Sequence, residues 1–500
     1  MKRGVRILLA VAAITIPSAA AAQNQAVHRL TLEEAVEIAR LNNPLLRQTA
    51  NNLGGTTWGI RNAYASFFPS VSLSGGIGYT GAGSQRFLTS EFIQPSATIG
   101  SQYRINLSLL LSGRTIMQPG LATAQHRAAE AALEGTEINL ESVIRQQYLA
   151  VLQAEAQAEL AELQVTRNDE FLRLAQARFD VGQNTLLDVR QAEVARGQSE
   201  VALLQARQLV IVDKLRLYQT MGVPAPEPSA IVLTDTFPII EPGWELEGLL
   251  AEADQANPDL IFLRANSSAA KAGERATKSE WLPSLSFSAG WSGFTQQFTD
   301  ANAAATNTIA GARAEATASV QQCQFSNANW LNPGLTPIDC SQFALTPSDE
   351  EQIRQSVLDQ NSVFPWNFTS QPFSASVGIS LPIFTQFSRP LRIAEASAAA
   401  DDAKEAVRAR ELQVRTDVSQ AYYALQAAYE AIGIQENNQE AAAEQLRLAT
   451  ERYRVGSGTF FELLDAQLAA QTAEADYIND IYAYHQSIAT LEDAVGRPLR

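Results

Sequence analysis

The sequence has little histidine, a residue type that catalytic and metal sites use often. Its 500 residues include three histidines, His28, His126 and His485, which lie far apart along the chain. It contains neither a cluster of metal-ligand residues nor the motifs of nucleophile elbows and phosphate-binding loops. The glycine pattern at 76–81 matches a dinucleotide-binding motif in letters, but it lies in a strand-like run that no helix follows. We therefore expect neither an enzyme nor a cofactor.

Positive charge is scarce as well. The chain has 37 lysines and arginines against 53 aspartates and glutamates, which gives a net charge of −16. Proteins that bind nucleic acid do so largely by neutralising phosphates with basic residues. A nucleic-acid partner is therefore not expected, and the solubility of long exposed helices is the simplest explanation for the acid excess.

Long apolar runs are absent beyond Ala22. The segment that ends there carries three basic side chains before an apolar run and closes on small residues, the pattern of a secretory signal peptide cleaved after Ala22. A membrane anchor is the alternative, but the apolar run is shorter than the roughly 20 residues that a spanning helix needs. We therefore expect an exported chain whose mature part is soluble, peripheral or a β-barrel protein.

Only two cysteines occur, Cys323 and Cys340, and both lie in one stretch rich in Asn, Gln, Thr and Pro. An exported chain reaches an oxidising compartment, where cysteines pair. A metal site is the alternative, but no histidine or further cysteine lies nearby to complete it. We expect a disulfide between Cys323 and Cys340 that pins a long loop.

What the sequence does contain is an internal duplication. Residues 178–188 (RFDVGQNTLLD) align with 452–462 (RYRVGSGTFFE) at an offset of 274. Upstream, 68–74 (FPSVSLS) align with 282–288 (LPSLSFS) at an offset of 214. The change of offset indicates an insertion of about 60 residues in the second half, within the polar stretch from about 299 to 373.

Each half contains two stretches in which apolar residues alternate with Ser, Gly or Asn, which is the period of a β-strand. The expected strands span about 69–80, 98–112, 283–296 and 372–384. A half-buried sheet of a soluble protein explains any one of them equally well. Four such strands of about 10 to 13 residues in an exported chain fit the apolar-out alternation of a membrane barrel.

Proline is absent from two long intervals, 120–223 and 391–497, and both are rich in helix-forming Ala, Gln, Glu, Leu and Arg. Apolar residues within them recur at helical spacing. Each interval is interrupted once, near 181–184 and near 455–459, by glycines that can end a helix. The sequence therefore predicts two long helical hairpins with tight tips.

The chain is expected to divide into a signal peptide at 1–22, a first repeat at 23–224, a linker at 225–244 and a second repeat at 245–500, which carries the loop 299–371. Each repeat would hold short helices, strands and one long hairpin. Four strands cannot close a barrel, and lipid does not tolerate an open sheet edge. Two copies would supply eight strands and three would supply twelve with room for a lumen, and the residues alone permit either.

One known family shares this order of features. Residues 31–39 (TLEEAVEIA) before Asn43-Pro44, the paired strands, and the hairpin tips at 178–182 and 452–456 together resemble the TolC family of outer-membrane efflux proteins. The resemblance implies a mixed α and β membrane protein, a homotrimer with a twelve-stranded transmembrane β-barrel and a periplasmic α-barrel built from the long hairpins. It places the protein in the outer-membrane lipid of a Gram-negative-type bacterium, extending into the periplasm.

The resemblance also implies a function. Such a protein is the exit duct of a tripartite efflux or type I secretion system, and its partners are a periplasmic adaptor (membrane fusion) protein and an inner-membrane pump of the RND, ABC or MFS type. Nothing in the chain separates drug efflux from protein secretion. A periplasmic coiled-coil scaffold or adaptor without its own pore is the alternative, but it would not need four amphipathic strands.

Members of this family narrow the periplasmic mouth with acids just after the second tip, and the matching residues here are Glu462 and Asp465. Three copies would form rings of carboxylates that attract cations. Asp188 occupies the equivalent of Glu462 in the first repeat, and both could instead stabilise the start of a helix. The ring is favoured for Asp465. Some relatives lock the mouth with a basic residue where this chain has Gly458.

The tips themselves are expected to dock the adaptor through Val181, Gly182, Val455 and Gly456, although the glycines would turn the chain in any case.

One aromatic residue in each repeat stands just before the first expected strand. Phe67 and Trp281 are expected at the inner interface of the membrane, where aromatic girdles form, with core packing as the alternative.

Overall fold

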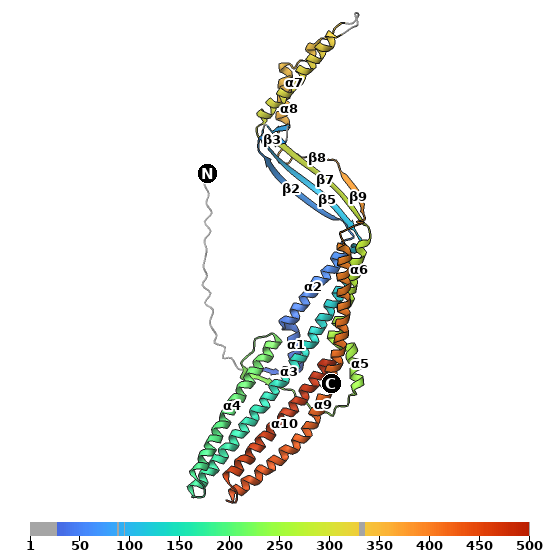
Figure 1. Ribbon diagram of the computed structural model, residues 1–500. Coiled ribbons are helices and arrows are strands. Elements are labelled where there is room, and N and C mark those ends of the chain that lie inside the picture. The colour runs from blue at the N-terminus through green and yellow to red at the C-terminus, as the bar shows by residue number, and fades with distance from the viewer. Residues whose placement is uncertain (1–27, 88–89, 95, 330–335, 500) are drawn as a thin grey trace, which may run out of the picture. The chain divides into compact units, whose positions relative to one another are not determined.

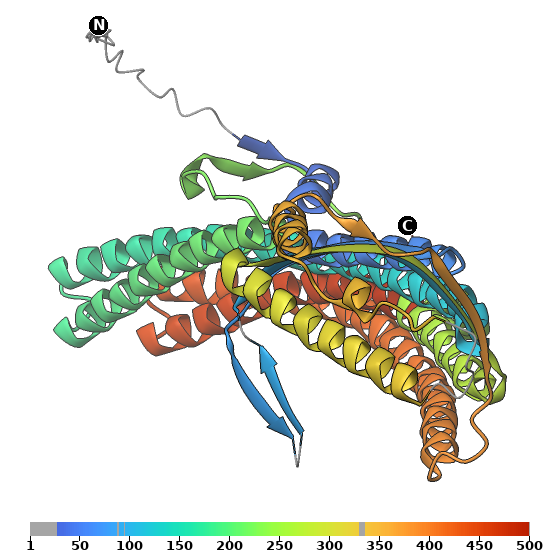
Figure 2. The same ribbon diagram turned by 90° about the horizontal axis from the view of Figure 1, so that it is seen from above.

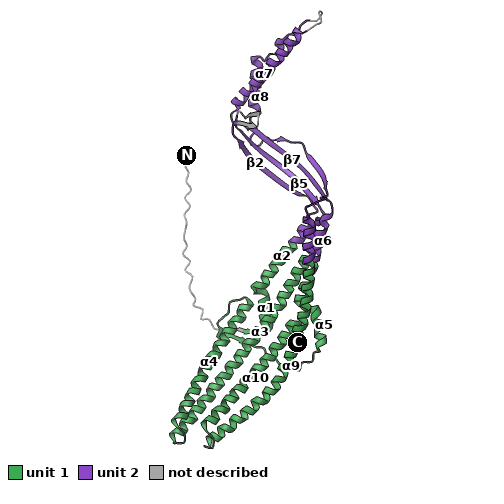
Figure 3. Cartoon of the chain, in the orientation of Figure 1, with its two compact units in different colours: residues 1–57, 124–269, 400–500 green, residues 58–123, 270–399 purple. Residues whose placement is uncertain are grey.

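The computed structural model describes residues 28–87, 90–94, 96–329 and 336–499 (Figure 1). The expected signal peptide at 1–22 lies outside the described residues. The chain forms two compact units: residues 1–57, 124–269 and 400–500 make the first, and 58–123 and 270–399 make the second (Figure 3). Each unit therefore draws on both sequence repeats.

The first unit is built on four long helices that lie side by side in Figures 1 and 2. They are α3 (Gly113–Asp180) with α4 (Leu186–Met221), and α9 (Ser388–Arg454) with α10 (Phe460–Val495). The chain turns between α3 and α4, and again between α9 and α10, at the two places where the sequence interrupts its helical pattern.

Shorter elements complete this unit in both repeats. Helices α1 (Leu32–Asn42) and α2 (Pro44–Ala65) precede the first hairpin, and α5 (Leu246–Ala256) and α6 (Pro258–Lys278) precede the second. The parallel strands β1 (His28–Leu30) and β6 (Ile231–Leu233) pair with each other, and a short 3₁₀ turn, η1 (Pro228–Ala230), leads into β6. Helices α2, α3, α6 and α9 contribute residues to both units.

Equivalent residues of the two repeats form the apolar core of the first unit. Ile144 and Leu217 are buried in one cluster, and their repeat equivalents Val418 and Leu491 are buried in another. All four side chains are fully buried. The duplication therefore extends to the residues on which the helices pack.

The second unit is built on an antiparallel sheet. Its strands are β2 (Ser70–Thr80), β5 (Thr98–Leu111), β7 (Ser284–Phe298), β8 (Thr369–Ser370) and β9 (Ser374–Ser380). The order is β2-β5-β7, and the far side of β7 pairs with both β8 and β9. A separate hairpin, β3 (Gly83–Phe87) with β4 (Ser90–Gln94), lies between β2 and β5 in the sequence.

The last strand is shorter than the expected 372–384. Strand β9 ends at Ser380, before Pro382, which has no amide hydrogen for a sheet. Gln386 and Phe387 then adopt positive φ angles of 53° and 60°, and α9 begins at Ser388. The chain therefore turns from strand to helix over residues 381–387.

The expectation of a loop at 299–371 is wrong. This stretch holds α7 (Ala301–Ala328), a 3₁₀ turn η3 (Cys340–Phe343) and α8 (Pro347–Gln360). Helix α7 is rich in alanine, the best helix former, and Asp300 caps its first turn. Helix α8 starts with a capping box of Thr346 and Asp349.

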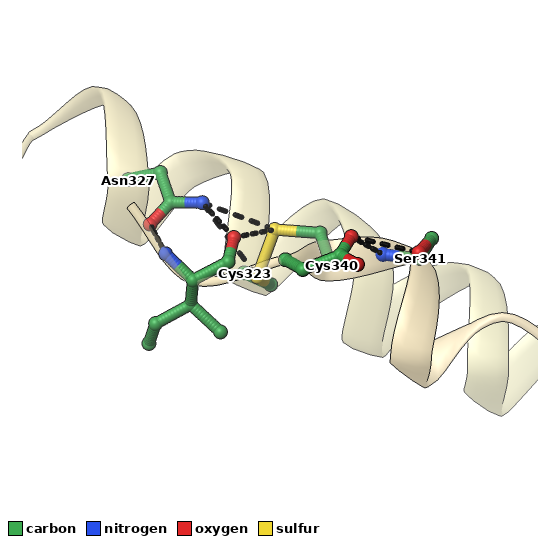
Figure 4. The surroundings of a disulfide bond; sticks show 6 residues. Cys323, Asn327, Cys340 and Ser341 are labelled. Carbon is green, nitrogen blue, oxygen red and sulfur yellow. Dashed lines mark hydrogen bonds between the residues drawn. A yellow bond between two sulfur atoms is a disulfide. The ribbon is translucent and has the colours of Figure 1, made fainter. Parts of the chain in front are cut away.

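A disulfide joins Cys323 of α7 to Cys340, and it staples helical rather than loop structure (Figure 4). Beside it, the Asn327 amide donates to the Ile338 carbonyl at 2.7 Å and accepts from the Ile338 amide at 3.1 Å. The two segments are therefore held by a side chain as well as by the disulfide.

Candidate functional site

The register of the sheet places apolar side chains on one face. Leu73 lies opposite Ile105, Ile105 lies opposite Trp291, and Phe287 lies opposite Val377 across successive strands. On the outer strands this face is largely uncovered, since Leu73 of β2 is 75% exposed and Ile379 of β9 is 77% exposed. An exposed apolar face of this extent marks a surface that contacts lipid or protein.

The opposite face carries mainly small polar residues. Ser72 lies opposite Asn106, and Ser288 lies opposite Ser376, whose hydroxyl is 2.7 Å away. Further serines and glycines continue this face along β2, β7 and β9. The two faces of the sheet therefore differ as the lipid-facing and water-facing sides of a membrane strand do.

Both lateral edges of the sheet are open. In the described part of the chain, β2 pairs only with β5, and β9 pairs only with β7. Edge strands present unpaired amide and carbonyl groups that another strand can satisfy. A single chain therefore leaves half of the hydrogen bonds of β2 and β9 without a strand partner.

The expected interface aromatics lie where helices enter the strands. Phe67 follows α2 and is 37% exposed, and Trp281 ends the 3₁₀ turn η2 (Ser279–Trp281) and is 49% exposed. The Arg389 guanidinium stands 5.5 Å from the centre of the Trp281 ring. Neither aromatic is buried in a core.

Ion pairs fasten the same end of the sheet. Glu280 accepts from Arg114 at 3.0 Å and from Arg392 at 2.7 Å. These three residues come from the start of α3, from η2 and from the start of α9, so one carboxylate ties together elements of both repeats.

The hairpin tips have matching geometry. Gly182 and Gly456 adopt φ angles of 77° and 82°, which favour glycine. Val181 and Val455 before them are 69% and 74% exposed. The four residues expected to dock a partner therefore form two exposed turns of the same shape.

A contact that the sequence does not predict joins the two tips. The Arg178 guanidinium stands 4.6 Å from the centre of the Tyr453 ring and donates to the Tyr453 carbonyl, while the Asn184 amide donates to the Tyr453 hydroxyl. Tyr453 is 1% exposed, and burial raises the pKa of its hydroxyl. The repeat alignment offered a signal, because Arg178 and Arg452 match, but not the pairing across repeats.

The expected mouth acids fall into two groups. Asp188 and Glu462 each sit at the third position of a helix and form a capping box with Thr185 and Thr459, respectively. Glu462 also lies 3.5 Å from Arg452. Asp465, one turn further along α10, is exposed. Helix capping thus accounts for Asp188 and Glu462, whereas it does not account for Asp465.

Polar contacts connect α3 of the first repeat with α10 of the second. Arg145 pairs with Glu492, Arg167 pairs with Glu474 at 2.7 Å, and the buried Gln467 amide donates to Asn168 at 2.5 Å. Residue numbers rise along α3 as they fall along α10, so the helices run antiparallel. The hairpins therefore meet through charges and amides at this seam.

Helix α4 leaves an apolar stripe uncovered. Leu187, Val194 and Val201 recur every seven residues and are 64%, 59% and 54% exposed. A seven-residue apolar repeat is the seam of a coiled coil. The first unit therefore offers a helical surface suited to another helix.

Among the described residues, no helix combines the length and the apolar character that crossing a membrane requires.

Within the described part of the chain, His, Cys, Asp and Glu side chains do not gather in groups of three or more that could hold a metal ion.

The family model for "Outer membrane efflux protein" matches residues 35–223 and 354–497. Its two matched segments contain the two hairpins, α3 with α4 and α9 with α10.

Curated relatives carry similar descriptions. The "Probable efflux pump outer membrane protein TtgC" of Pseudomonas putida KT2440 is 27% identical over 270 residues, which cover 52% of this chain and 54% of that protein. The "Antibiotic efflux pump outer membrane protein ArpC" of Pseudomonas putida matches with the same identity and coverage. This chain is thus matched over about half the length of these relatives.

Solved structures share the fold. The outer membrane protein VceC of Vibrio cholerae superposes with a TM-score of 0.68 at 18% identity, covering 94% of this chain and 97% of that one. The CmeC outer membrane channel of Campylobacter jejuni superposes with a TM-score of 0.70 at 14% identity, covering 93% and 85%. At these identities the likeness establishes the fold alone.

Proposed function

This chain belongs to the outer membrane efflux protein family, and we propose on that basis that three copies of it form an export duct through the outer membrane. The duct is passive: it carries cargo that an inner-membrane pump delivers. It stands in the outer membrane of a Gram-negative-type bacterium and extends into the periplasm.

The sheet of the second unit is the observation that carries this proposal. It has an exposed apolar face, a small polar face and two open edges. Lipid covers the apolar face without cost, but it cannot satisfy the unpaired backbone groups of β2 and β9. Pairing β2 of one copy with β9 of the next closes the sheet and satisfies both edges.

Three copies suit this closure better than two. Two copies give about eight strand positions, whose interior side chains fill, whereas three give about twelve and leave a lumen. Membership of the outer membrane efflux protein family also favours three copies. The serines and glycines of the polar face then line water, and Phe67 and Trp281 lie at the inner interface of the membrane.

The long hairpins form the periplasmic part. The stripe of Leu187, Val194 and Val201 on α4 is covered by a hairpin of a neighbouring copy, and this burial contributes about 1.5–3 kcal/mol per fully covered side chain. The two tips carry Val181, Gly182, Val455 and Gly456 outward and dock a periplasmic adaptor. The inner-membrane pump, of RND, ABC or MFS type, joins through that adaptor.

Small-molecule efflux is favoured over protein secretion. The matched relatives are described as antibiotic and toluene efflux proteins, which suggests small hydrophobic cargo. A protein-secretion duct remains the second candidate, because nothing in the tips distinguishes the two adaptors.

Native mass spectrometry of the detergent-extracted protein tests the assembly. We expect a trimer in the outer-membrane fraction that opens pores in planar bilayers. A monomer that stays in the soluble periplasmic fraction would instead support a scaffold without a pore.

Deletion of the gene tests the cargo. The deleted cells should become sensitive to antibiotics or organic solvents. If they stop secreting a protein but do not become sensitive, the secretion duct is favoured.

A further inference from the structure

Arg104 is the one charged residue of the membrane sheet. The sequences of β2, β5, β7, β8 and β9 contain no other Asp, Glu, Lys or Arg. Arg104 lies near the middle of β5, opposite Ser74 on β2 and Ser292 on β7. It therefore stands on the small polar face, with neutral residues on either side.

The charge of Arg104 is not compensated within the described chain. None of the ion pairs found there involves Arg104, and its neighbours on the same face of β5 are Gln102 and Asn106. The side chain is exposed and lines a concavity of about 350 Å³ with Asn106 and Ser288. The other residues that line this concavity are neutral: serines, alanines, a glycine, Asn106 and Trp291.

A charged side chain near the middle of a membrane-spanning strand needs contact with water. A charged arginine on the lipid face near the bilayer midplane costs about 2–4 kcal/mol, but on the lumen face it costs little and acts on what passes. The alternation of the strand places Arg104 opposite in direction to Tyr103 and Ile105, which share the apolar face. The lumen face is therefore the side on which it belongs.

We propose that Arg104 sets the ion selectivity of the membrane section of the duct, where three copies form a ring that attracts anions and repels cations. This inference rests on the proposed trimeric pore. The ligand class is anionic: chloride in a test, and carboxylate, sulfonate or phosphate groups on cargo.

The dimensions of the pore make the ring effective. Twelve strands about 4.8 Å apart and tilted about 40° enclose a radius of roughly 12 Å. Guanidinium groups that reach inward from three sides then lie about 10 Å from one another, comparable with the Debye length of about 10 Å at 0.1 M salt. At 1 M salt that length falls to about 3 Å, so the field no longer spans the lumen.

The ring is positive, whereas the whole chain carries a net charge of −16. A cation-attracting mouth and an anion-attracting membrane section would act in series on the same path. An anionic cargo therefore meets a lower barrier in the membrane section than a cationic cargo does.

The experiment measures reversal potentials of the full-length protein in planar bilayers under a potassium chloride gradient. Arg104→Gln should raise the permeability of K⁺ relative to Cl⁻ by about twofold or more near 0.1 M salt, and the change should vanish near 1 M. Arg104→Lys is the matched control, because it keeps the charge and should keep the wild-type ratio. Gln already occupies position 102 on the same face, so the strand accepts that side chain.

Each outcome decides between explanations. If Arg104→Gln and Arg104→Lys shift the ratio equally, side-chain size and not charge sets it, and the proposal is overturned. If neither shifts it while pores still form, Arg104 has no role in selectivity, although the duct itself stands. If the wild-type protein opens no pore, both the ring and the proposed function fail. Arg104→Glu gives a second check, since it should move the ratio further in the same direction as Gln.

Discussion

Asn43 and Asn257 hold equivalent helix ends in the two repeats. The Asn43 amide donates to the Thr220 carbonyl at 2.8 Å, and the Asn257 amide donates to the Ala494 carbonyl at 2.9 Å. Thr220 and Ala494 themselves align when the two repeats are superimposed in sequence. In each repeat, the residue before a proline therefore fixes the end of the second long helix.

The glycine beyond each of these helix ends has no room for a side chain. Gly222 and Gly496 have φ angles of 78° and 90°, and an added Cβ would come within 2.6 Å of the Asn42 carbonyl oxygen and 2.5 Å of that of Ala256. We expect Gly222→Ala or Gly496→Ala to cost at least about 1–2 kcal/mol and to lower Tm. Gly433→Ala is the control, since nothing lies within 4 Å of its position in α9, and it should be neutral or stabilising. Equal Tm values for all three variants would contradict this reasoning.

The buried pair of Arg145 and Glu492 gives a second prediction. Their side chains are 15% and 4% exposed, and Glu492 also accepts from the Leu499 amide at 2.9 Å. Glu492→Gln leaves Arg145 with Glu141, at 3.3 Å, as its remaining charge partner in the described chain, so the substitution should cost less than the about 3–5 kcal/mol of a fully uncompensated buried charge. Denaturant unfolding measures it.

The double variant Arg145→Met with Glu492→Leu supplies the control for that pair. It removes both charges and should be more stable than Glu492→Gln alone. A double variant that is less stable than the single one would mean that packing, not charge, dominates at this place.

Much of the fold was predictable because it follows from periodicity. Proline-free intervals and tip glycines located the hairpins, and period-two alternation located strands near β2, β5 and β7. The insertion was misjudged because α7 is rich in Ala, Thr, Asn and Gln without an apolar stripe. Its helical character comes from alanine and from capping at Asp300, which hydrophobic periodicity does not reveal.

The candidate site was less predictable for a different reason. Repeat alignment places Val181 and Val455 in equivalent turns and Asp188 and Glu462 at equivalent helix starts, because these features depend on local sequence. The contact of Arg178 with Tyr453 depends on how two hairpins pack, 275 residues apart in the chain. The sequence alone does not identify Arg104 as a site residue. The register of the sheet is needed to show that its neighbours on the adjacent strands are neutral.

The tip contact leads to a prediction about dynamics. Tyr453→Phe removes the acceptor for the Asn184 amide and should cost about 1 kcal/mol locally. We expect faster amide hydrogen exchange in residues 175–189 of the other hairpin. Tyr423→Phe, at an exposed tyrosine of the same helix, is the control and should leave the exchange unchanged. Unchanged exchange in Tyr453→Phe would show that the tips move independently.

The role proposed for Asp465 can be separated from helix capping. Asp465→Asn should lower the preference of the pore for K⁺ over Cl⁻ by about twofold at low salt, because three carboxylates leave the mouth. Its Tm should stay near the wild-type value, since Asp465 lies beyond the capping box. Glu436→Gln removes one exposed acid from α9 and should leave selectivity unchanged. Selectivity that responds equally to both variants would argue against a ring at Asp465.

The raised pKa of Asp493 predicts how the stability of the protein changes with pH. Burial in α10 is the main cause of its raised pKa. The charge of Asp259 raises the pKa further, while a hydrogen bond from Ser142 and the charge of Arg410 oppose the rise.

The sign of the effect follows from proton binding. Between the ordinary aspartate pKa of 3.8 and the raised value, the folded protein binds more protons than the unfolded chain, so stability falls as pH rises through that window. At pH values above the raised pKa, the cost of the buried charge is fully present. Asp493→Asn removes that cost, and the variant should melt at a higher temperature than wild type above that pKa. The difference should shrink as pH falls toward 3.8, where wild-type Asp493 becomes protonated.

Asp402→Asn, at an exposed position of α9, is the control and should show no such dependence. A Tm difference that stays constant over this range would mean that the asparagine acts through packing or hydrogen bonding, and not through the proton.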